Sequence, residues 1–184
     1  MKVIIMLIVA TTLLLGCGPS SRVQLPITYK ASHSSSLNKI CPVKFDVLDV
    51  RKNKQSLGNY GGLSVNADSS VEQWIENGIE KYFEGTVKIN NSLSKSTGWK
   101  ILLKKSYITT LATKFSSNIV LSLENQQQNY KRLFRGNNVR TNWSGGRSEM
   151  IDSLNLALVD SLRVMNKELD SICMKSSATQ VVFN

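Results

Sequence analysis

Basic and aromatic side chains are concentrated in one stretch of the chain, from Tyr130 to Trp143. Guanidinium groups bind phosphate and carboxylate and also stack on aromatic rings, so the stretch suits contacts with anionic headgroups. As a strand, it would place Tyr130, Arg132 and Phe134 on one face of a sheet. The alternative is a solvated edge strand, whose charges discourage aggregation. The candidate ligand-binding or partner-binding residues are Lys104, Tyr130, Arg132, Phe134, Arg135 and Arg140.

Cys17 ends an opening segment that has the composition of an export signal. Lys2 precedes an apolar run, Val3 to Leu15, which is shorter than the ~20 residues that a membrane-spanning helix needs. The sequence Leu14-Leu15-Gly16-Cys17 resembles the bacterial lipobox, at which the signal peptide is removed and the cysteine is acylated. We therefore predict a signal peptide over residues 1–16 and a lipid-anchored Cys17. An ordinary secretory signal with an incidental cysteine is the alternative.

The predicted export limits the kinds of anionic partner that this positively charged chain could bind. The chain has a formal net charge of +10, and the segment from Lys100 to Arg147 contains Glu124 as its one acidic residue. Export argues against nucleic acid, so the candidates are anionic lipid, lipopolysaccharide or an acidic protein surface. In Gram-negative lipoproteins an Asp directly after the acylated cysteine marks retention at the inner membrane. Gly18 occupies that position here, so the outer membrane is favoured over the inner membrane, with the domain facing the periplasm.

Few residues are suited to catalysis or metal binding. His33, the one histidine, lies in a Ser-rich stretch, so a hydrolytic triad would lack its base. Asp46 and Asp49 fall on opposite faces of one predicted strand, whereas Asp49 and Arg51 share a face, where we expect a salt bridge. We expect no catalytic residues, no metal site and no cofactor, and hence no enzymatic activity.

The remaining cysteines, Cys41 and Cys173, are an even pair in a chain that is predicted to be exported. An oxidising compartment favours a disulfide between them. Two buried, unpaired thiols are the alternative, because cysteine is commonly buried even when it is free. Two isolated cysteines cannot complete a tetrahedral zinc site.

The periodicity of apolar residues predicts one domain behind a flexible tether. We assign residues 17–39 to the lipidated cysteine and tether and residues 40–184 to the domain. Strands are predicted over 40–50, 99–111, 118–123 and 130–143, helices over 71–84 and 148–174, and a flexible polar connection over 51–69. The order β-α-β-β-β-α predicts an α+β two-layer sandwich, with two helices on one face of a mostly antiparallel four-stranded sheet. In that topology Cys41 and Cys173 lie at the same end.

These features together resemble the YajG-like family of bacterial lipoproteins. The resemblance is carried by the lipobox, the Asp49-x-Arg51 end of the first strand, the helix that stops at Gly85, the strand from Ile101 to Leu111 and the helix from Met150 to Met165. It implies a periplasm-facing α/β domain without an assigned catalytic activity. The general shape is also similar to the lipoprotein of lipopolysaccharide assembly and to auxiliary lipoproteins of lipid-transport ABC systems.

Two functions are compatible with this sequence. The first is a non-catalytic envelope lipoprotein that docks a partner protein as an accessory or assembly factor. The second is a binding module for anionic lipid or lipopolysaccharide, which would use a basic strand surface. Ionic strength should separate them, because headgroup binding weakens steeply with salt and an apolar protein interface does not.

Overall fold

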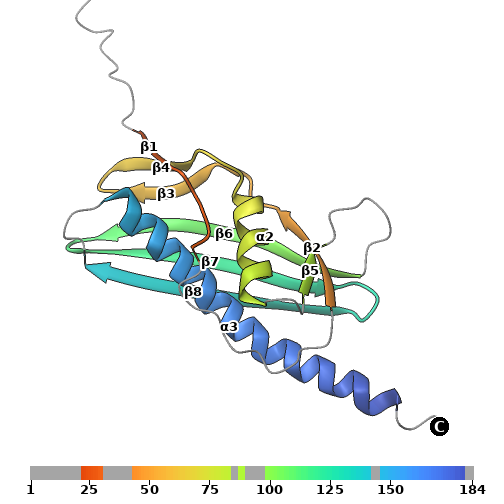
Figure 1. Cartoon of the computed structure of the whole chain (residues 1–184). Coiled ribbons are helices and arrows are strands. Elements are labelled where there is room, and N and C mark those ends of the chain that lie inside the picture. Colours follow the sequence, from red (N-terminus) through yellow and green to blue (C-terminus); the bar gives the residue numbers. More distant parts are fainter. Residues whose placement is uncertain (1–21, 31–42, 84–86, 90–97, 142–145, 181–184) are drawn as a thin grey trace, which may run out of the picture.

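A computed structural model describes residues 22–30, 43–83, 87–89, 98–141 and 146–180 of the chain (Figure 1). Within these ranges eight strands form one sheet, and two helices cover one of its faces. The strands are β1 (Arg22–Leu25), β2 (Val43–Asp49), β3 (Ser56–Tyr60), β4 (Leu63–Ala67), β5 (Val87–Ile89), β6 (Trp99–Leu111), β7 (Lys114–Asn125) and β8 (Tyr130–Thr141). The helices are α2 (Val71–Tyr82) and α3 (Arg147–Gln180).

The expected four-stranded, mostly antiparallel sheet is wrong: the sheet is mixed and has twice as many strands. Its order is β1-β4-β3-β6-β2-β5, and β7 and β8 continue from the other side of β6. The pairs β1–β4, β2–β5, β2–β6 and β3–β6 are parallel. The pairs β3–β4, β6–β7 and β7–β8 are antiparallel.

The segment predicted as a flexible connection contains the β3–β4 hairpin. Its turn is Gly61-Gly62, and both residues have positive φ, at 55° and 82°. Two adjacent positive φ angles give the twist that a tight hairpin needs, and glycine adopts them without a steric penalty. The buried side chains of Leu57 and Val65 turn the hairpin into part of the core. Gly61-Gly62 is therefore the turn between two short strands.

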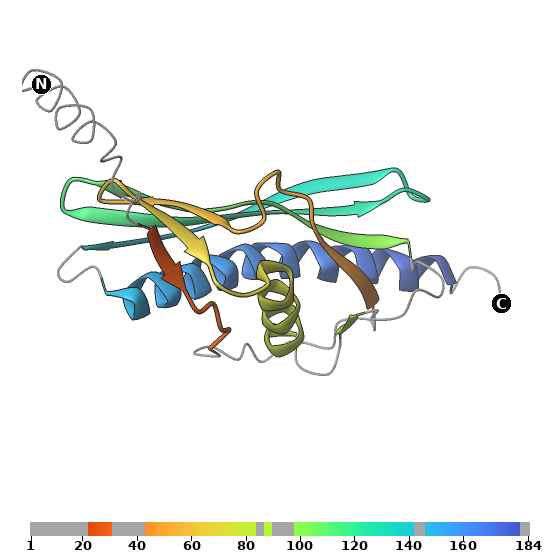
Figure 2. The ribbon, with the colours of Figure 1, turned by 90° about the horizontal axis from the view of Figure 1, so that it is seen from above.

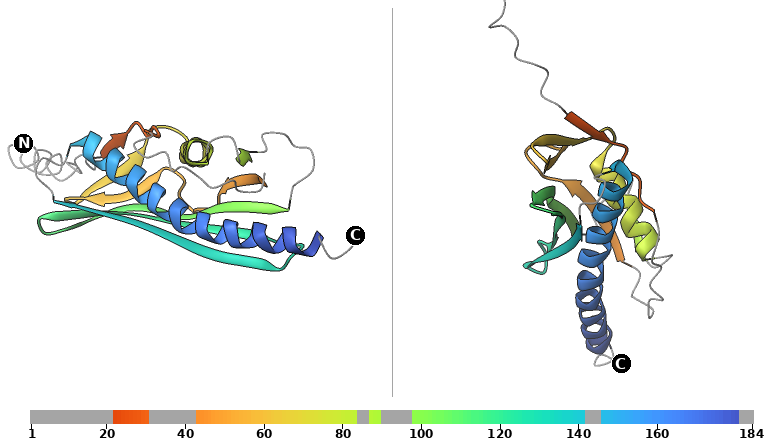
Figure 3. Two further views of the ribbon diagram at one scale, coloured as in Figure 1. Left: turned by 60° about the horizontal axis from the view of Figure 1, so that its bottom comes forward. Right: turned by 90° about the vertical axis from the view of Figure 1, so that its left-hand side faces the viewer.

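Part of the predicted β-α-β-β-β-α order is present as a meander and a crossover. Strands β6, β7 and β8 follow one another antiparallel, and β2 connects to the parallel strand β6 through the β3–β4 hairpin, α2 and β5. Figures 2 and 3 show that α2 and α3 lie on the same side of the sheet. We call the opposite side of the sheet the outer face. The helices leave it open, and antiparallel sheets tolerate such exposure.

Helix α2 begins directly after a capping residue, Ser70. The Ser70 side chain accepts a hydrogen bond from the backbone N–H of Gln73, which satisfies one of the free donors of the first turn. Trp74, Ile75 and Ile79 are buried against the sheet and α3. Burial of such side chains stabilises the fold by ~2 kcal/mol each. These residues form the apolar face of the helix that was predicted over 71–84.

Residues 22–30 fall inside the range assigned to the tether, yet they belong to the domain. Leu25, Ile27 and Tyr29 are all buried in the core. The Asn155 side chain in α3 connects this segment to the helices, since its Nδ2 donates to the carbonyl oxygen of Thr28 at 3.1 Å and its Oδ1 accepts from the Trp74 indole at 2.8 Å. Residues 22–30 therefore pack as part of the domain.

Candidate functional site

The structure divides the six predicted binding residues between two faces of the sheet. Strand β8 pairs with β7 in continuous register, so its even-numbered and odd-numbered residues alternate strictly between the faces. Lys104 and Arg135 lie on the outer face. The other four residues, Tyr130, Arg132, Phe134 and Arg140, lie on the side that α3 covers. One common binding surface for all six is therefore absent.

Three of the residues on the helix side have structural contacts. Phe134 is buried in the core. The Tyr130 hydroxyl donates to Glu168 of α3 at 3.0 Å, and Arg132 forms an ion pair with the same carboxylate. Burial, followed by the hydrogen bond and the charge of Glu168, raises the pKa of Tyr130 to about 12. These contacts fasten α3 to β8.

A bulge in β6 concentrates positive charge on the outer face. Leu103 pairs with Leu121 and Lys105 pairs with Val120, so Lys104 is the extra residue. A bulge interrupts the alternation of side chains, and here it places two consecutive lysines on one face. The same shift puts Tyr107 and Leu111 on the outer face, whereas strict alternation would place them on the same face as Ile101. A bulge leaves no clear mark in the sequence.

A groove of about 570 Å³ crosses β6, β7 and β8 on the outer face. We call it the basic groove. Lys104, Lys105, Lys131 and Arg135 contribute four cations, and Tyr107, Val120 and Leu133 contribute apolar surface. None of the described residues that line it is acidic. Strict alternation along β8 places Lys131 and Arg135 on the same face of the sheet. Lys105 shares that face only because of the bulge, which the sequence does not reveal.

Glu124 balances part of the charge beside the basic groove. Its carboxylate lies 3.5 Å from the Lys104 ammonium and 3.1 Å from that of Lys131, and it accepts a hydrogen bond from Ser122 at 2.8 Å. Burial raises the pKa of Glu124, but the hydrogen bonds from Ser122 and Lys131 and the charges of both lysines outweigh it and lower the pKa below 4.5. Lys105 and Arg135 have no acidic partner among the described ion pairs.

Two further hollows continue the basic groove along the outer face. The first shares Lys104, Lys105 and Tyr107 with the groove and extends to Lys52. The second shares Asn53, Ser56 and Gly58 with the first and extends to Arg22 and Gln24 of β1. The three hollows thus run one after another along the outer face, from β1 to β8.

Asp49 and Arg51 form the salt bridge that the sequence predicted, and it is buried. Arg51 Nε and Nη2 donate to the two carboxylate oxygens of Asp49 at 2.9 and 2.8 Å, and Nη1 donates to the carbonyl oxygen of Ser56 at 2.9 Å. Only 6% of the Arg51 side chain and 2% of the Asp49 side chain are exposed. The pair fixes the connection between β2 and β3.

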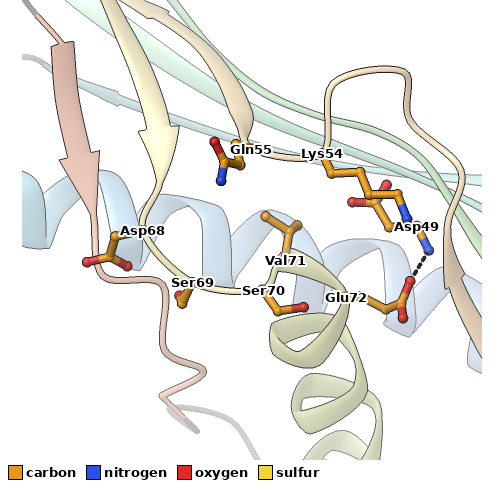
Figure 4. Close-up of a pocket in the computed structure, with 8 residues that line it drawn as sticks. All are labelled: Asp49, Lys54, Gln55, Asp68, Ser69, Ser70, Val71 and Glu72. Atoms are coloured by element: carbon orange, nitrogen blue, oxygen red, sulfur yellow. Dashed lines mark hydrogen bonds between the residues drawn. The ribbon is translucent and has the colours of Figure 1, made fainter.

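A smaller cleft of about 360 Å³ lies at the start of α2 (Figure 4). Asp49, Asp68 and Glu72 line it, together with Lys54. The Glu72 carboxylate accepts the backbone N–H of Asp49 at 2.7 Å, so this carboxylate is engaged in holding β2 against α2. Across the described ranges, no cluster of three or more His, Cys, Asp or Glu residues could hold a metal ion.

The predicted lipidation site, Cys17, and the predicted disulfide, Cys41 with Cys173, involve side chains outside the described residues. Neither prediction is tested by the structure. In the part of the chain that is described, neither helix is long and apolar enough to cross a membrane.

Comparison with solved structures shows the fold class of the chain. A protein from Xanthomonas campestris that belongs to family DUF330 matches with a TM-score of 0.52 and 12% sequence identity, over 86% of this chain and 99% of that one. A candidate lipoprotein from Caulobacter crescentus CB15 matches more weakly, with a TM-score of 0.39 and 10% identity over 71% and 91% of the two chains. A PelC dodecamer from Paraburkholderia phytofirmans gives a TM-score of 0.35 and 11% identity over 70% and 94%.

No family model matches the sequence, and no curated protein matches it. The likeness to the Xanthomonas protein therefore shows the fold alone, and it shows nothing about a ligand. The resemblance to the YajG-like family remains a prediction.

Proposed function

We propose that this chain is a non-catalytic, lipid-anchored protein of the bacterial envelope that binds anionic lipid through the outer face of its sheet. The observation that carries the proposal is the basic groove, where four cations lie beside Tyr107 and Leu133 without a described acid in the lining. Phosphate headgroups need cations, and the adjoining glycerol and acyl carbons need apolar contact. The groove offers both within one surface.

The composition of the groove favours lipid over a protein partner. Three of its cations, Lys104, Lys105 and Lys131, are lysines. Lysine is depleted at protein–protein interfaces, whereas arginine and aromatic residues are enriched there. Basic residues near an anionic bilayer surface contribute ~1 kcal/mol each to binding. Even with Glu124 beside Lys104 and Lys131, the four cations leave a net positive surface that suits reversible headgroup binding.

A partner protein is the second candidate, and one feature of the outer face favours it. Leu48, Leu102 and Leu133 lie in a single cross-strand row with Ser122, and the side chains of Leu48 and Leu133 are 42% and 49% exposed. The two exposed leucines of this row, Leu48 and Leu133, offer apolar contacts to another protein. In this role the chain would serve as an accessory or assembly factor.

The lipid that copurifies with the acylated protein tests the proposal. Wild type would be compared with an outer-face variant, Lys105→Gln/Lys131→Gln/Arg135→Gln. A helix-layer variant, Arg140→Gln/Arg163→Gln/Lys167→Gln, loses the same formal charge from the opposite side of the sheet and is the matched control. Protein and bound phospholipid would be quantified by mass spectrometry after purification in mild detergent.

We expect anionic phospholipid to be enriched with wild type and with the helix-layer variant, and to fall at least about tenfold in the outer-face variant. Equal lipid content in all three proteins would contradict the proposal. One stoichiometric protein, retained by all three at high salt, would establish the accessory function in its place.

A further inference from the structure

We infer that the outer face lies on the headgroups of the same bilayer that holds the acylated Cys17. The inference rests on the proposed function and names the source of the anionic lipid. The occupant of the outer face would be the anionic surface of the anchoring membrane, rather than a single lipid delivered from elsewhere. Chain length, the course of β1, the distribution of charge and the exposed apolar side chains carry the argument.

The connection between the predicted anchor and the domain is short. Only residues 18–21 separate Cys17 from the start of β1 at Arg22. Even a fully extended chain spans at most ~18 Å over that interval. A tether that continued to residue 39 would allow the domain to stand far from the membrane. The burial of Leu25, Ile27 and Tyr29 removes that freedom.

The exposed side chains of β1 lie on the outer face. Val23 and Leu25 point toward the core, so Arg22 and Gln24 alternate to the opposite side. There they line the hollow that continues through Asn53, Ser56 and Gly58 toward the basic groove. In Figure 1, β1 lies beside β4 and β3 at one end of the long meander. The anchor would therefore hold this end of the outer face near the bilayer.

Charge is distributed unequally between the two layers. The segment from Trp99 to Thr141 contains eight basic residues and one acid, whereas α2 and α3 together contain eight acids and five basic residues. Six of the eight basic residues alternate to the outer face: Lys100, Lys104, Lys105, Lys114, Lys131 and Arg135. Beside an anionic bilayer this asymmetry turns the sheet toward the lipid and the helices away from it.

Exposed apolar side chains are also more numerous on the outer face than on the helix layer. Seven large hydrophobic side chains are exposed among the described residues, and four of them, Leu48, Leu111, Leu133 and Val139, lie on the outer face. The helix layer contributes Val164. At a membrane surface, apolar side chains between cations contact the boundary between headgroups and acyl chains. An acyl anchor and a basic surface together also give stable attachment to a membrane, since each contributes to binding.

Lipid photo-crosslinking in proteoliposomes can measure this orientation. A benzoylphenylalanine would be introduced into the acylated protein as Val139→benzoylphenylalanine on the outer face or Val164→benzoylphenylalanine on α3. The two positions are a matched pair, because their side chains are 54% and 45% exposed. Bilayers of phosphatidylcholine with phosphatidylglycerol would supply the anionic surface. A third protein would carry the Val139 probe and a Gly/Ser insert of ~20 residues before Arg22, which adds a mean span of ~25 Å.

We expect lipid adducts at Val139 to exceed those at Val164 at least about fivefold, and to decrease when the insert is present. Equal lipid yields at the two positions would overturn the inference, and so would protein adducts in place of lipid at Val139. Failure of the proposed function is a separate result: the chain without acyl groups would then show no preference for phosphatidylglycerol vesicles. A chain that prefers those vesicles but gives equal adducts would keep the proposed function and lose the orientation.

Discussion

Gly136 of β8 lies directly against the backbone of Ala157 in α3. A Cβ at position 136 would come within 1.8 Å of the Ala157 carbonyl oxygen and within 2.5 Å of the backbone nitrogen of Ser161. Neither backbone atom can move without displacing the helix, so we expect Gly136→Ala to lower the free energy of unfolding by ~3 kcal/mol or more. Chemical denaturation followed by circular dichroism would measure this change.

Gly61→Ala is the control for the loss of a glycine. Gly61 has a φ of 55° but no atom within 4 Å of a built Cβ, so the substitution carries a backbone cost of ~1 kcal/mol and no clash. Equal destabilisation by the two substitutions would contradict the close packing of α3 on β8.

The buried ion pair between Asp49 and Arg51 gives a second prediction. Arg51→Met would leave the Asp49 carboxylate buried without its partner and should lower the free energy of unfolding by ~3–5 kcal/mol. The double variant Asp49→Leu/Arg51→Met removes both charges and should regain a part of that loss, as a double-mutant cycle would show. Additive losses from the two substitutions would mean that the carboxylate does not depend on the guanidinium.

The attachment of residues 22–30 to the helices gives a third prediction. Asn155→Ala would remove the partners of the Trp74 indole N–H and of the Thr28 carbonyl, at a cost of ~2–4 kcal/mol. Because the segment ends at Lys30, limited trypsin digestion should cut there faster in the variant than in wild type. Asn155→Asp keeps an acceptor for Trp74 and is the milder control. Unchanged cleavage in both variants would mean that Asn155 does not hold the segment.

Glu124 gives a prediction about pH. Its pKa is lowered in the folded chain, so its contribution to stability is present above pH 4.5 and is lost as the pH falls through the lowered pKa. Glu124→Gln should reduce the free energy of unfolding at neutral pH by less than ~1 kcal/mol, because the site is partly exposed. Denaturation curves should converge as the pH falls well below 4.5. A difference that persisted in acid would show that Glu124 acts through its shape rather than through its charge.

The sequence predicted the elements that carry strong periodicity. The meander of β6, β7 and β8, the parallel crossover from β2, and the placement of both helices on one side are confirmed. Each of these elements is long or strongly amphipathic, so its buried face is visible in the order of residues alone. The hairpin around Gly61-Gly62 and the strand at Arg22–Leu25 are only four or five residues long per strand. Their pairing depends on distant partners, which local patterns do not reveal.

The candidate site was predicted in composition but not in geometry. The basic character of the meander was evident, and two of the predicted binding residues, Lys104 and Arg135, line the basic groove. The alternation of β8 separates Arg132 from Arg135, but the sequence does not say which face the helix covers. The bulge at Lys104 then adds Lys105 to the outer face. A one-residue change of register thus decides which cations share a surface.

The most direct test of the central claim is a vesicle titration of the chain from Gly18 onward, which carries no acyl group. The buried core residues that the structure describes lie between Leu25 and Leu169, so this chain retains all of them. Binding to vesicles with phosphatidylglycerol would be compared with binding to phosphatidylcholine alone, at low and high ionic strength, for wild type, the outer-face variant and the helix-layer variant. We predict preference for phosphatidylglycerol that weakens with salt, a loss of about 100-fold in affinity for the outer-face variant, and little change for the helix-layer variant. Equal affinity for both kinds of vesicle, or equal losses in the two charge-matched variants, would contradict the account.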